Sequence, residues 1–300
     1  MKRTDVGLAL LCVLLWGSTF PVIKALLAFT PAVFLNAARF CVIALPALFL
    51  PFPKISKFRF FAYALLFGCG QYLLSTLSMH LGLSAGVAAV LMQVQVFVTI
   101  LLSWVFLKEG VRREQLIGVV LGFGGLLLFV LFNTSLAVSV SGLVAVVAAS
   151  LSWAAVNMIV KVSRVTNLTS LVAWGAITNV PILFAVSWQM GELSSLHPTT
   201  PQLFQLALGL IFLGLVVTFG VSVIWNRLLQ KHDAIKIVPF SILIPIVGMC
   251  SSWLIFDDLA QKQLFPMALV LLGLAITFVK RQKRAVQAEP QPVRVPVQAE

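Results

Sequence analysis

Residues 8–24, LALLCVLLWGSTFPVIK, resemble residues 145–161, AVVAASLSWAAVNMIVK. In both stretches an apolar run contains one tryptophan, Trp16 or Trp153, and ends eight residues later on a lysine. Similarity at a long, fixed interval indicates an internal repeat, in which one structural unit occurs twice. The chain is therefore expected to fold as two related halves.

A second matched pair supports the repeat. Residues 100–130, ILLSWVFLKEGVRREQLIGVVLGFGGLLLFV, resemble residues 248–279, GMCSSWLIFDDLAQKQLFPMALVLLGLAITFV, with Trp104 aligned on Trp253. The first pair lies near the start of each half and the second near its end. The repeat therefore covers nearly the whole chain.

The composition places these repeats in a bilayer. Hydrophobic residues make up 60% of the 300 residues and charged residues only 10%, against roughly 25% charged in an average soluble protein. The apolar runs are continuous and approach the ~20 residues that a transmembrane helix needs. The sequence predicts ten such helices, at residues 6–27, 33–52, 58–80, 85–107, 114–132, 141–160, 169–188, 203–229, 234–256 and 263–279.

Each half contains five predicted helices, and an odd number makes the two halves enter the membrane in opposite senses. Inverted repeats are typical of alternating-access transporters, whose substrate site lies between the repeats near the middle of the bilayer. The predicted fold is an all-α integral membrane protein with ten transmembrane helices in two inverted five-helix repeats. We place the repeats at residues 1–135 and 136–280, and a disordered cytoplasmic tail at 281–300.

The net charge of +12, from 21 Lys and Arg against 9 Asp and Glu, is compatible with nucleic-acid binding or with the basic cytoplasmic loops of a membrane protein. The positions of the basic residues decide between these classes. All but Lys24, Arg39 and Lys262 lie at the termini or in connections on one side of the spans. Because positive residues collect on the cytoplasmic side, both termini are expected in the cytoplasm. The charge forms no single patch, so the expected partner is the lipid bilayer and not nucleic acid.

These features give the chain a family resemblance. The start WGSTFPVIK, the NAARF of the second span, and SAGVAAVLMQVQVFVTI followed by a KEG turn are similar to those of EamA-type drug/metabolite transporters, over residues 6–279. The Gln93-x-Gln95 segment and KEGVRREQLIGVVLGFGG look most like the branch that exports O-acetylserine and cysteine. The resemblance implies a bacterial inner-membrane exporter of small amino-acid-like metabolites, with a central cavity lined mainly by spans 1, 3, 4, 6, 8 and 9. An exporter of aromatic amino acids, or of drugs or other metabolites, is the alternative.

The acidic residues bear on the transport mechanism. None of the 9 Asp and Glu residues lies in the middle of a predicted span, whereas a carboxylate at membrane depth is the usual proton relay. We therefore expect facilitated export or exchange. A membrane enzyme would need convergent acids, a His pair or a metal cluster at that depth, so no catalytic residue, metal or cofactor is expected. The sequence leaves a monomer and a homodimer open.

Polar and aromatic residues within the spans are the candidates for binding a small-molecule substrate. Trp16 and Trp153 lie away from the interfaces where Trp gathers, so they either line the site or pack at the repeat axis. The candidates in the third and fourth spans are Gln71, Tyr72, Ser75, Gln93 and Gln95. On an unbroken helix the two last-named glutamines point about 200° apart, so only one is expected to face the cavity. Interhelical hydrogen bonding is the alternative role for these side chains.

Three further candidates carry an amide or a charge. Asn157 lies one turn after Trp153, and Asn226 lies near the cytoplasmic end of the eighth span, where each can meet a substrate from the cytoplasm. Arg39 lies inside the second span, where a charge is costly. It either snorkels and pairs with helix carbonyls or binds a substrate carboxylate.

The fifth span contains a GxxxG pattern at Gly118 and Gly122. Small residues at this spacing let two membrane helices approach closely. The pattern predicts tight packing against the tenth span, with a dimer interface as the alternative.

Overall fold

The computed structural model is a bundle of helices and describes residues 2–108, 110–133, 139–163, 165–231, 240–241, 243–256 and 261–278. In these ranges there is no β-strand. Eight helical segments are long and apolar enough to cross a membrane, and two shorter apolar helices match the ninth and tenth predicted spans. The prediction of an all-helical membrane protein is therefore confirmed. The first residues of the ninth predicted span, from 234, and the tail at 281–300 lie outside the described ranges.

The helices follow the predicted spans closely. Those of the first half are α1 (Arg3–Gly17), α2 (Thr19–Leu26), α3 (Ala32–Ala44), η1 (Leu45–Phe49), α4 (Lys57–Leu65), η2 (Leu66–Leu73), α5 (Leu74–His80), α6 (Ala85–Leu91), α7 (Val94–Leu107) and α8 (Arg113–Asn133). Those of the second half are α9 (Val140–Ser163), α10 (Leu168–Gln189), α11 (Thr200–Ile211), η3 (Phe212–Val221), α12 (Ser222–Lys231), α14 (Leu243–Phe256) and α15 (Gln261–Phe278).

Two spans that the sequence predicts as single helices are broken near their middle. The first span breaks at Ser18, between α1 and α2, and the fourth breaks at Met92 and Gln93, between α6 and α7. The second break frees carbonyl groups that a membrane interior must satisfy. Ser150 of α9 supplies a donor, because its hydroxyl donates to the carbonyl oxygen of Leu91 at 3.1 Å. The break therefore depends on a contact from the other half of the chain.

The third and eighth spans each contain a π-helical segment, η2 and η3. These spans are counterparts in the two halves, so the irregularity repeats with the fold. A π-helix widens the turn, shifts the backbone hydrogen bonds and is frequent at functional sites. Each π-helical segment also has a backbone carbonyl near its start that accepts a hydrogen bond from the other half of the chain. The donor is a side chain of the seventh span for η2 and of the second span for η3. Asn179 of α10 donates to Ala64 at 2.7 Å, and Arg39 of α3 donates to Leu213 at 3.5 Å.

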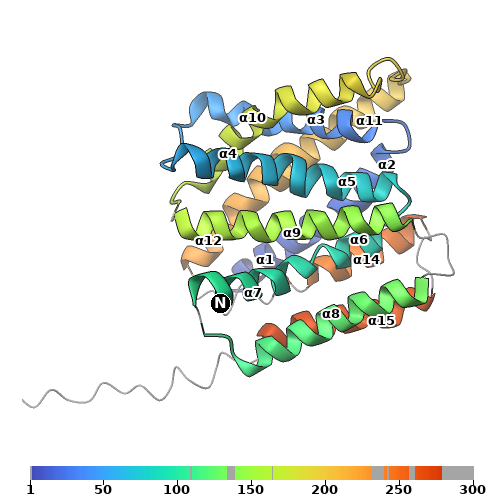
Figure 1. Cartoon of the computed structure of the whole chain (residues 1–300). Helices are drawn as coiled ribbons and strands as arrows, with labels where there is room; N and C mark the ends of the chain where they lie inside the picture. The colour runs from blue at the N-terminus through green and yellow to red at the C-terminus, as the bar shows by residue number, and fades with distance from the viewer. Residues whose placement is uncertain are drawn as a thin grey trace, which may run out of the picture.

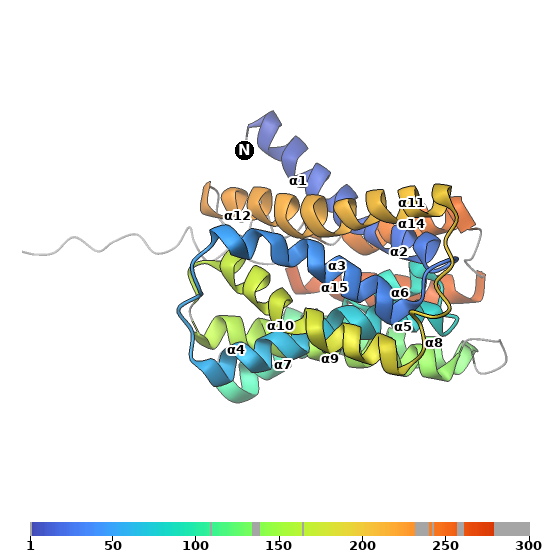
Figure 2. The same cartoon turned by 90° about the horizontal axis from the view of Figure 1, so that it is seen from above.

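Counterpart helices of the two halves pack against each other. The pairs are α3 with α10, α6 with α14, and α8 with α15. In Figure 1, α8 and α15 lie side by side along one edge of the bundle, with α3 and α10 near the opposite edge. Figure 2 shows α11 and α12 following one another in one line above α3. The two halves are therefore interleaved, and do not form separate bundles.

Glycines permit the closest of these contacts, between α8 and α15. A Cβ atom on Gly118 would lie 2.5 Å from the carbonyl oxygen of Gly273, and one on Gly273 would lie 2.6 Å from that of Gly118. The second glycine of the pattern, Gly122, faces the ring of Phe97 in α7 and the backbone of Gly273. The predicted packing of the GxxxG pattern against the tenth span is confirmed.

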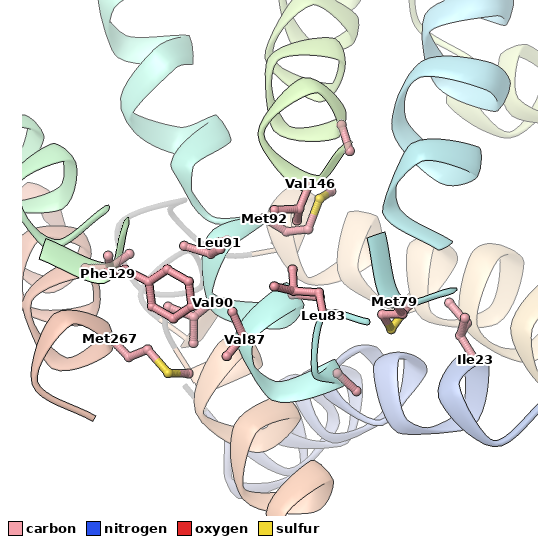
Figure 3. Close-up of a cluster of buried hydrophobic side chains, with 14 of the residues drawn as sticks. Ile23, Met79, Leu83, Val87, Val90, Leu91, Met92, Phe129, Val146 and Met267 are labelled. Atoms are coloured by element: carbon pink, nitrogen blue, oxygen red, sulfur yellow. The ribbon is translucent and has the colours of Figure 1, made fainter. Parts of the chain in front are cut away.

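The main apolar core surrounds α6. All seven residues of this helix are buried, and Figure 3 shows Val87, Val90 and Leu91 facing Phe129 of α8 and Met267 of α15. The helix begins at Ser84, whose hydroxyl accepts from the backbone N–H of Val87 at 3.3 Å. The short half-helix is thereby held rigidly between the two halves.

Candidate substrate-binding site

A cavity of about 240 Å³ lies toward the end of the bundle where α9 and α12 finish and α4 and α10 begin. Drug-sized ligands usually occupy pockets of roughly 300–1,000 Å³, so this one suits a small metabolite. Its walls come from both halves and carry aromatic, aliphatic and uncharged polar side chains. They are Trp16, Tyr63, Val156, Asn157, Val160, Leu168, Thr169, Val172, Thr218, Phe219 and Trp225.

Two tryptophans from opposite halves form one wall. Trp16 lies in the last turn of α1, just before the break at Ser18. Its ring meets that of Trp225 in α12 edge-to-face, with centroids 5.2 Å apart and planes at 66°. This geometry is favourable for aromatic pairs because the positive ring edge meets the negative face. Both tryptophans also line the cavity.

Tyr63 forms another part of the wall. It lies in the second turn of α4, is only 3% exposed, and stacks on Phe67 with centroids 5.3 Å apart and planes at 14°. It was not among the residues predicted for the site, and a tyrosine near a span end is typical of the membrane interface. The signal in the sequence that could have drawn attention to Tyr63 is that the chain has only 2 tyrosines.

The cavity's amide is held by a contact between spans 4 and 6. The Asn157 Nδ2 group of α9 donates to Gln95 Oε1 of α7 at 2.8 Å. This bond holds the Asn157 amide, which lines the cavity, and its own Oδ1 accepts from no described residue. Thr218 of η3 is also on the wall, and its hydroxyl donates to the carbonyl oxygen of Leu213 at 2.8 Å. The site therefore combines fixed amide and hydroxyl groups with aromatic faces.

The structure brings some of the predicted residues to the cavity. Trp16 and Asn157 line it, and Gln95 contacts it through Asn157. Trp153 instead packs between the two large apolar clusters. Gln93 is 6% exposed and does not line the cavity. The expected angle between Gln93 and Gln95 assumed that both residues lie on one unbroken helix. That assumption was wrong, because Gln93 immediately precedes α7 at the break.

The predicted residues of the third span lie deeper in the bundle, outside the cavity lining. Gln71 and Tyr72 belong to η2, and Ser75 to α5. Gln71 and Ser75 are buried, at 7% and 9% exposed. The guanidinium group of Arg39 stacks over the ring of Tyr72 in a cation–π contact, with Cζ 4.4 Å from the ring centroid.

Arg39 does not snorkel to the membrane surface. Its side chain is 2% exposed and donates to the Leu213 carbonyl oxygen at 3.5 Å. The side chain of Asn226 lies outside the described part of the structure.

The end of the bundle nearest the cavity is basic. Lys57 begins α4, Lys161 lies in the last turn of α9, and Lys231 ends α12. Lys231 Nζ forms an ion pair with Asp5 Oδ1 of α1 at 2.8 Å, where the Asp5 side chain is 5% exposed and that of Lys231 53%. The pair joins α1 of the first half to α12 of the second.

Nothing in the described ranges resembles a metal centre. No group of three or more His, Cys, Asp or Glu side chains comes together there. The four cysteines are free thiols dispersed over the helices, at Cys12, Cys41, Cys69 and Cys250.

Comparison with known proteins identifies the family of this chain. The EamA-like transporter family matches residues 4–131 and 140–279. A protein of Escherichia coli (strain K12) named "Probable amino-acid metabolite efflux pump" is 33% identical over 96% of this chain and 99% of its own length. One of the same name from Salmonella typhimurium (strain LT2) is 33% identical, over 92% and 95%.

A solved structure shows the same arrangement of helices. It is a crystal structure that matches with a TM-score of 0.61 over 93% of this chain and 99% of that chain, at 16% sequence identity. At this identity the likeness shows a shared fold. With both repeats matched by the family and two relatives matched over nearly their full length, the chain belongs to the EamA-like transporter family.

Proposed function

We propose that the protein exports small amino-acid metabolites of the cysteine and O-acetylserine type by alternating access. The observation that carries the proposal is the cavity, which is small, uncharged, and walled by both halves. Its aromatic faces attract an ammonium group, and its amide and hydroxyl groups can hydrogen-bond a zwitterion. The names of the two relatives, probable amino-acid metabolite efflux pumps, support the same substrate class.

The orientation follows from the basic residues. The positive-inside rule assigns the end with Lys57, Lys161 and Lys231 to the cytoplasm of a bacterial inner membrane. On this orientation both termini are cytoplasmic, and substrate enters the cavity from the cytoplasm. It leaves when the interleaved helices of the two repeats, residues 1–135 and 136–280, rearrange about the site between them.

We propose facilitated export or exchange in place of a carboxylate-relayed proton pump. No Asp or Glu side chain lines the described cavity. Asp5, Glu114 and Glu192, the described acids, lie near helix ends or between helices. A proton relay at membrane depth needs a titrating group there, and the cavity's amide and hydroxyl groups stay neutral at physiological pH.

The test is efflux from proteoliposomes loaded with labelled solutes, with and without a proton gradient. Cysteine and O-acetylserine are expected to leave faster than from protein-free vesicles, at rates that collapsing the proton gradient changes little. The proposal is overturned if neither these nor any other amino acid moves while an apolar dye does. Loss of cysteine efflux on collapsing the gradient would overturn the facilitated mode alone.

Export of aromatic amino acids is the second candidate, because four of the side chains on the cavity wall are aromatic: Trp16, Tyr63, Phe219 and Trp225. The same assay separates the two. Faster efflux of phenylalanine or tryptophan than of cysteine at equal loading favours the second candidate.

A further inference from the structure

The second span holds a buried cation that no described carboxylate neutralises. The side chain of Arg39 is 2% exposed, and its partners are the Leu213 carbonyl oxygen at 3.5 Å and the face of the Tyr72 ring. Its Nε atom has no acceptor. A neutral carbonyl at the limit of hydrogen-bonding distance and a ring face compensate a buried positive charge only weakly.

If Arg39 only held a helix carbonyl, an uncharged side chain would be enough, as the other half of the molecule shows. In the opposite pair of helices, Asn179 of α10 donates to the carbonyl oxygen of Ala64, just before η2, at 2.7 Å, and to that of Gly175 at 2.9 Å. Its Oδ1 accepts from the Cys69 thiol at 3.4 Å. An uncharged amide therefore serves the π-helix of the third span with its polar atoms satisfied. The positive charge at Arg39 exceeds what holding a carbonyl requires.

The π-helical segment η2, whose Tyr72 contacts Arg39, holds a second buried group without a partner. Gln71, which directly precedes Tyr72 in η2, is 7% exposed, and its Oε1 atom has no donor. The free N–H donor of Arg39 can bind a carboxylate, and the free acceptor oxygen of Gln71 can bind an ammonium group. Buried polar groups without partners are rare, and each calls for an explanation such as a ligand.

Two chains of contacts connect Arg39 with the cavity. Thr218 on the cavity wall donates to the Leu213 carbonyl oxygen, the same atom that accepts from Arg39. Tyr63 on the wall stacks on Phe67, whose ring centroid is 4.9 Å from that of Tyr72, which carries the guanidinium group. Arg39 thus lies directly behind the cavity wall, on the side away from the basic end.

We propose that Arg39, held on the Tyr72 ring, binds the carboxylate of the transported solute at a subsite beyond the cavity. This inference rests on the proposed export function and narrows its substrates to carboxylate-bearing solutes. A bidentate guanidinium–carboxylate contact neutralises the buried charge. The substrate is drawn from the aromatic cavity toward the middle of the bundle, and Gln71 Oε1 accepts from its ammonium group.

The test compares an amino acid with its own carboxamide, which keeps the ammonium group and side chain but lacks the negative charge. Efflux of both is measured in proteoliposomes for the wild type, Arg39→Lys and Arg39→Gln. The wild type is expected to prefer the acid by at least about tenfold, because a site built for a charged group rejects the analogue that lacks it. Arg39→Gln is expected to bring the ratio close to one, and Arg39→Lys to keep part of it.

Asn179→Ala is the matched control, because it removes a buried polar contact to a π-helix without touching the proposed subsite. It is expected to lower efflux of acid and amide by the same factor, leaving their ratio unchanged. Should Arg39→Gln fail to fold, thermal stabilisation of the detergent-solubilised wild type by acid and by amide gives an independent readout. Stabilisation by the acid alone supports the subsite, and equal stabilisation overturns it.

The outcomes separate the two proposals. If the wild type moves amino acids but Arg39→Gln keeps the preference for the acid, or if the wild type shows no preference, the subsite is refuted and the export function stands. If the wild type moves no amino acid, both proposals fail.

Discussion

At the scale of single residues, Asn157 supplies the amide among the side chains that line the cavity. Its Nδ2 group is bound to Gln95 at 2.8 Å, and the same amide faces the ligand space. Hydrogen bonds between membrane helices contribute only about 0.6 kcal/mol on average. On the proposed function, we therefore expect the amide to contribute more to substrate binding than to folding.

Replacing Asn157 with Leu should reduce efflux roughly tenfold or more, since about 1.4 kcal/mol of lost substrate interaction corresponds to a factor of ten. The amount of folded protein in the membrane should change little. Labelled-solute efflux and size-exclusion profiles in detergent measure the two effects. Thr178→Val is the control, because that hydroxyl bonds only to Trp174 of its own helix. Wild-type efflux by Asn157→Leu would show that the cavity is not on the transport pathway.

At the scale of elements, the contact between α8 and α15 depends on glycines, which have no side chain to keep the two backbones apart. Gly118 and Gly273 approach so closely that any Cβ atom between them meets backbone. Backbone cannot move aside as the end of a flexible side chain can, so an added side chain must separate the helices.

Gly118→Leu should destabilise the protein by about 1–3 kcal/mol or more, the usual cost of overpacking. The loss should appear as a lower thermal unfolding temperature in detergent. Gly124→Leu is the matched control on the same helix, because a Cβ there meets nothing within 4 Å. Equal losses for both variants would contradict the close packing of α8 on α15.

A second contact between elements caps a helix across the repeat boundary. Glu192, which follows α10, accepts from the backbone N–H groups of Val33 at 3.2 Å and Phe34 at 2.8 Å, in the first turn of α3. Ser187 donates to the same carboxylate at 2.9 Å. A carboxylate suits a helix N-terminus because that end carries unsatisfied N–H groups and a partial positive charge.

Glu192→Ala should cost roughly 1.5–3 kcal/mol of stability, the range for hydrogen bonds to a charged group. Glu192→Gln should recover part of this, since the amide oxygen still accepts. The measurement is thermal unfolding of the purified protein. Ser194→Ala, in the same connection and bonded only to Gly191 within it, provides the control. An unfolding temperature unaffected by Glu192→Ala would exclude the cap.

At the scale of the whole molecule, the two halves are tied at opposite ends. Asp5 and Lys231 join α1 to α12 at the basic end, and Glu192 joins the connection after α10 to α3 at the other end. In the proposed alternating-access cycle, one end opens while the other stays closed. On that proposal, these ties lie where the motion makes and breaks contacts.

The proposed orientation can be tested with two exposed serines at opposite ends, Ser56 before α4 and Ser195 after α10. In a background with the four cysteines replaced, Ser195→Cys should react with a membrane-impermeant maleimide in intact cells. Ser56→Cys should react only after the membrane is disrupted. Labelling of Ser56→Cys in intact cells, with Ser195→Cys protected, would reverse the orientation.

Most of the helix content was predictable from the sequence because it depends on local composition. A span needs only an apolar run of sufficient length, and the tryptophans that mark the repeat, such as Trp16 and Trp153, can be matched without coordinates. The contact of Gly118 with the tenth span was also predictable, because one spacing pattern specifies a close approach. The site was predicted only in part: Trp16 and Asn157 line the cavity, whereas Tyr63 was missed.

Composition and internal similarity are enough to specify a membrane protein of two repeated halves whose basic residues gather on one side. The places where helices break or widen, and the polar groups that meet there, depend instead on tertiary contacts. The break before α7 is supported by Ser150, the carboxylate of Glu192 caps α3, and Arg39 rests on Tyr72. Each contact joins residues from different helices, and the membrane interior makes it necessary, because a polar group without water must find its partner elsewhere in the protein. Periodicity along one helix carries no information about that partner.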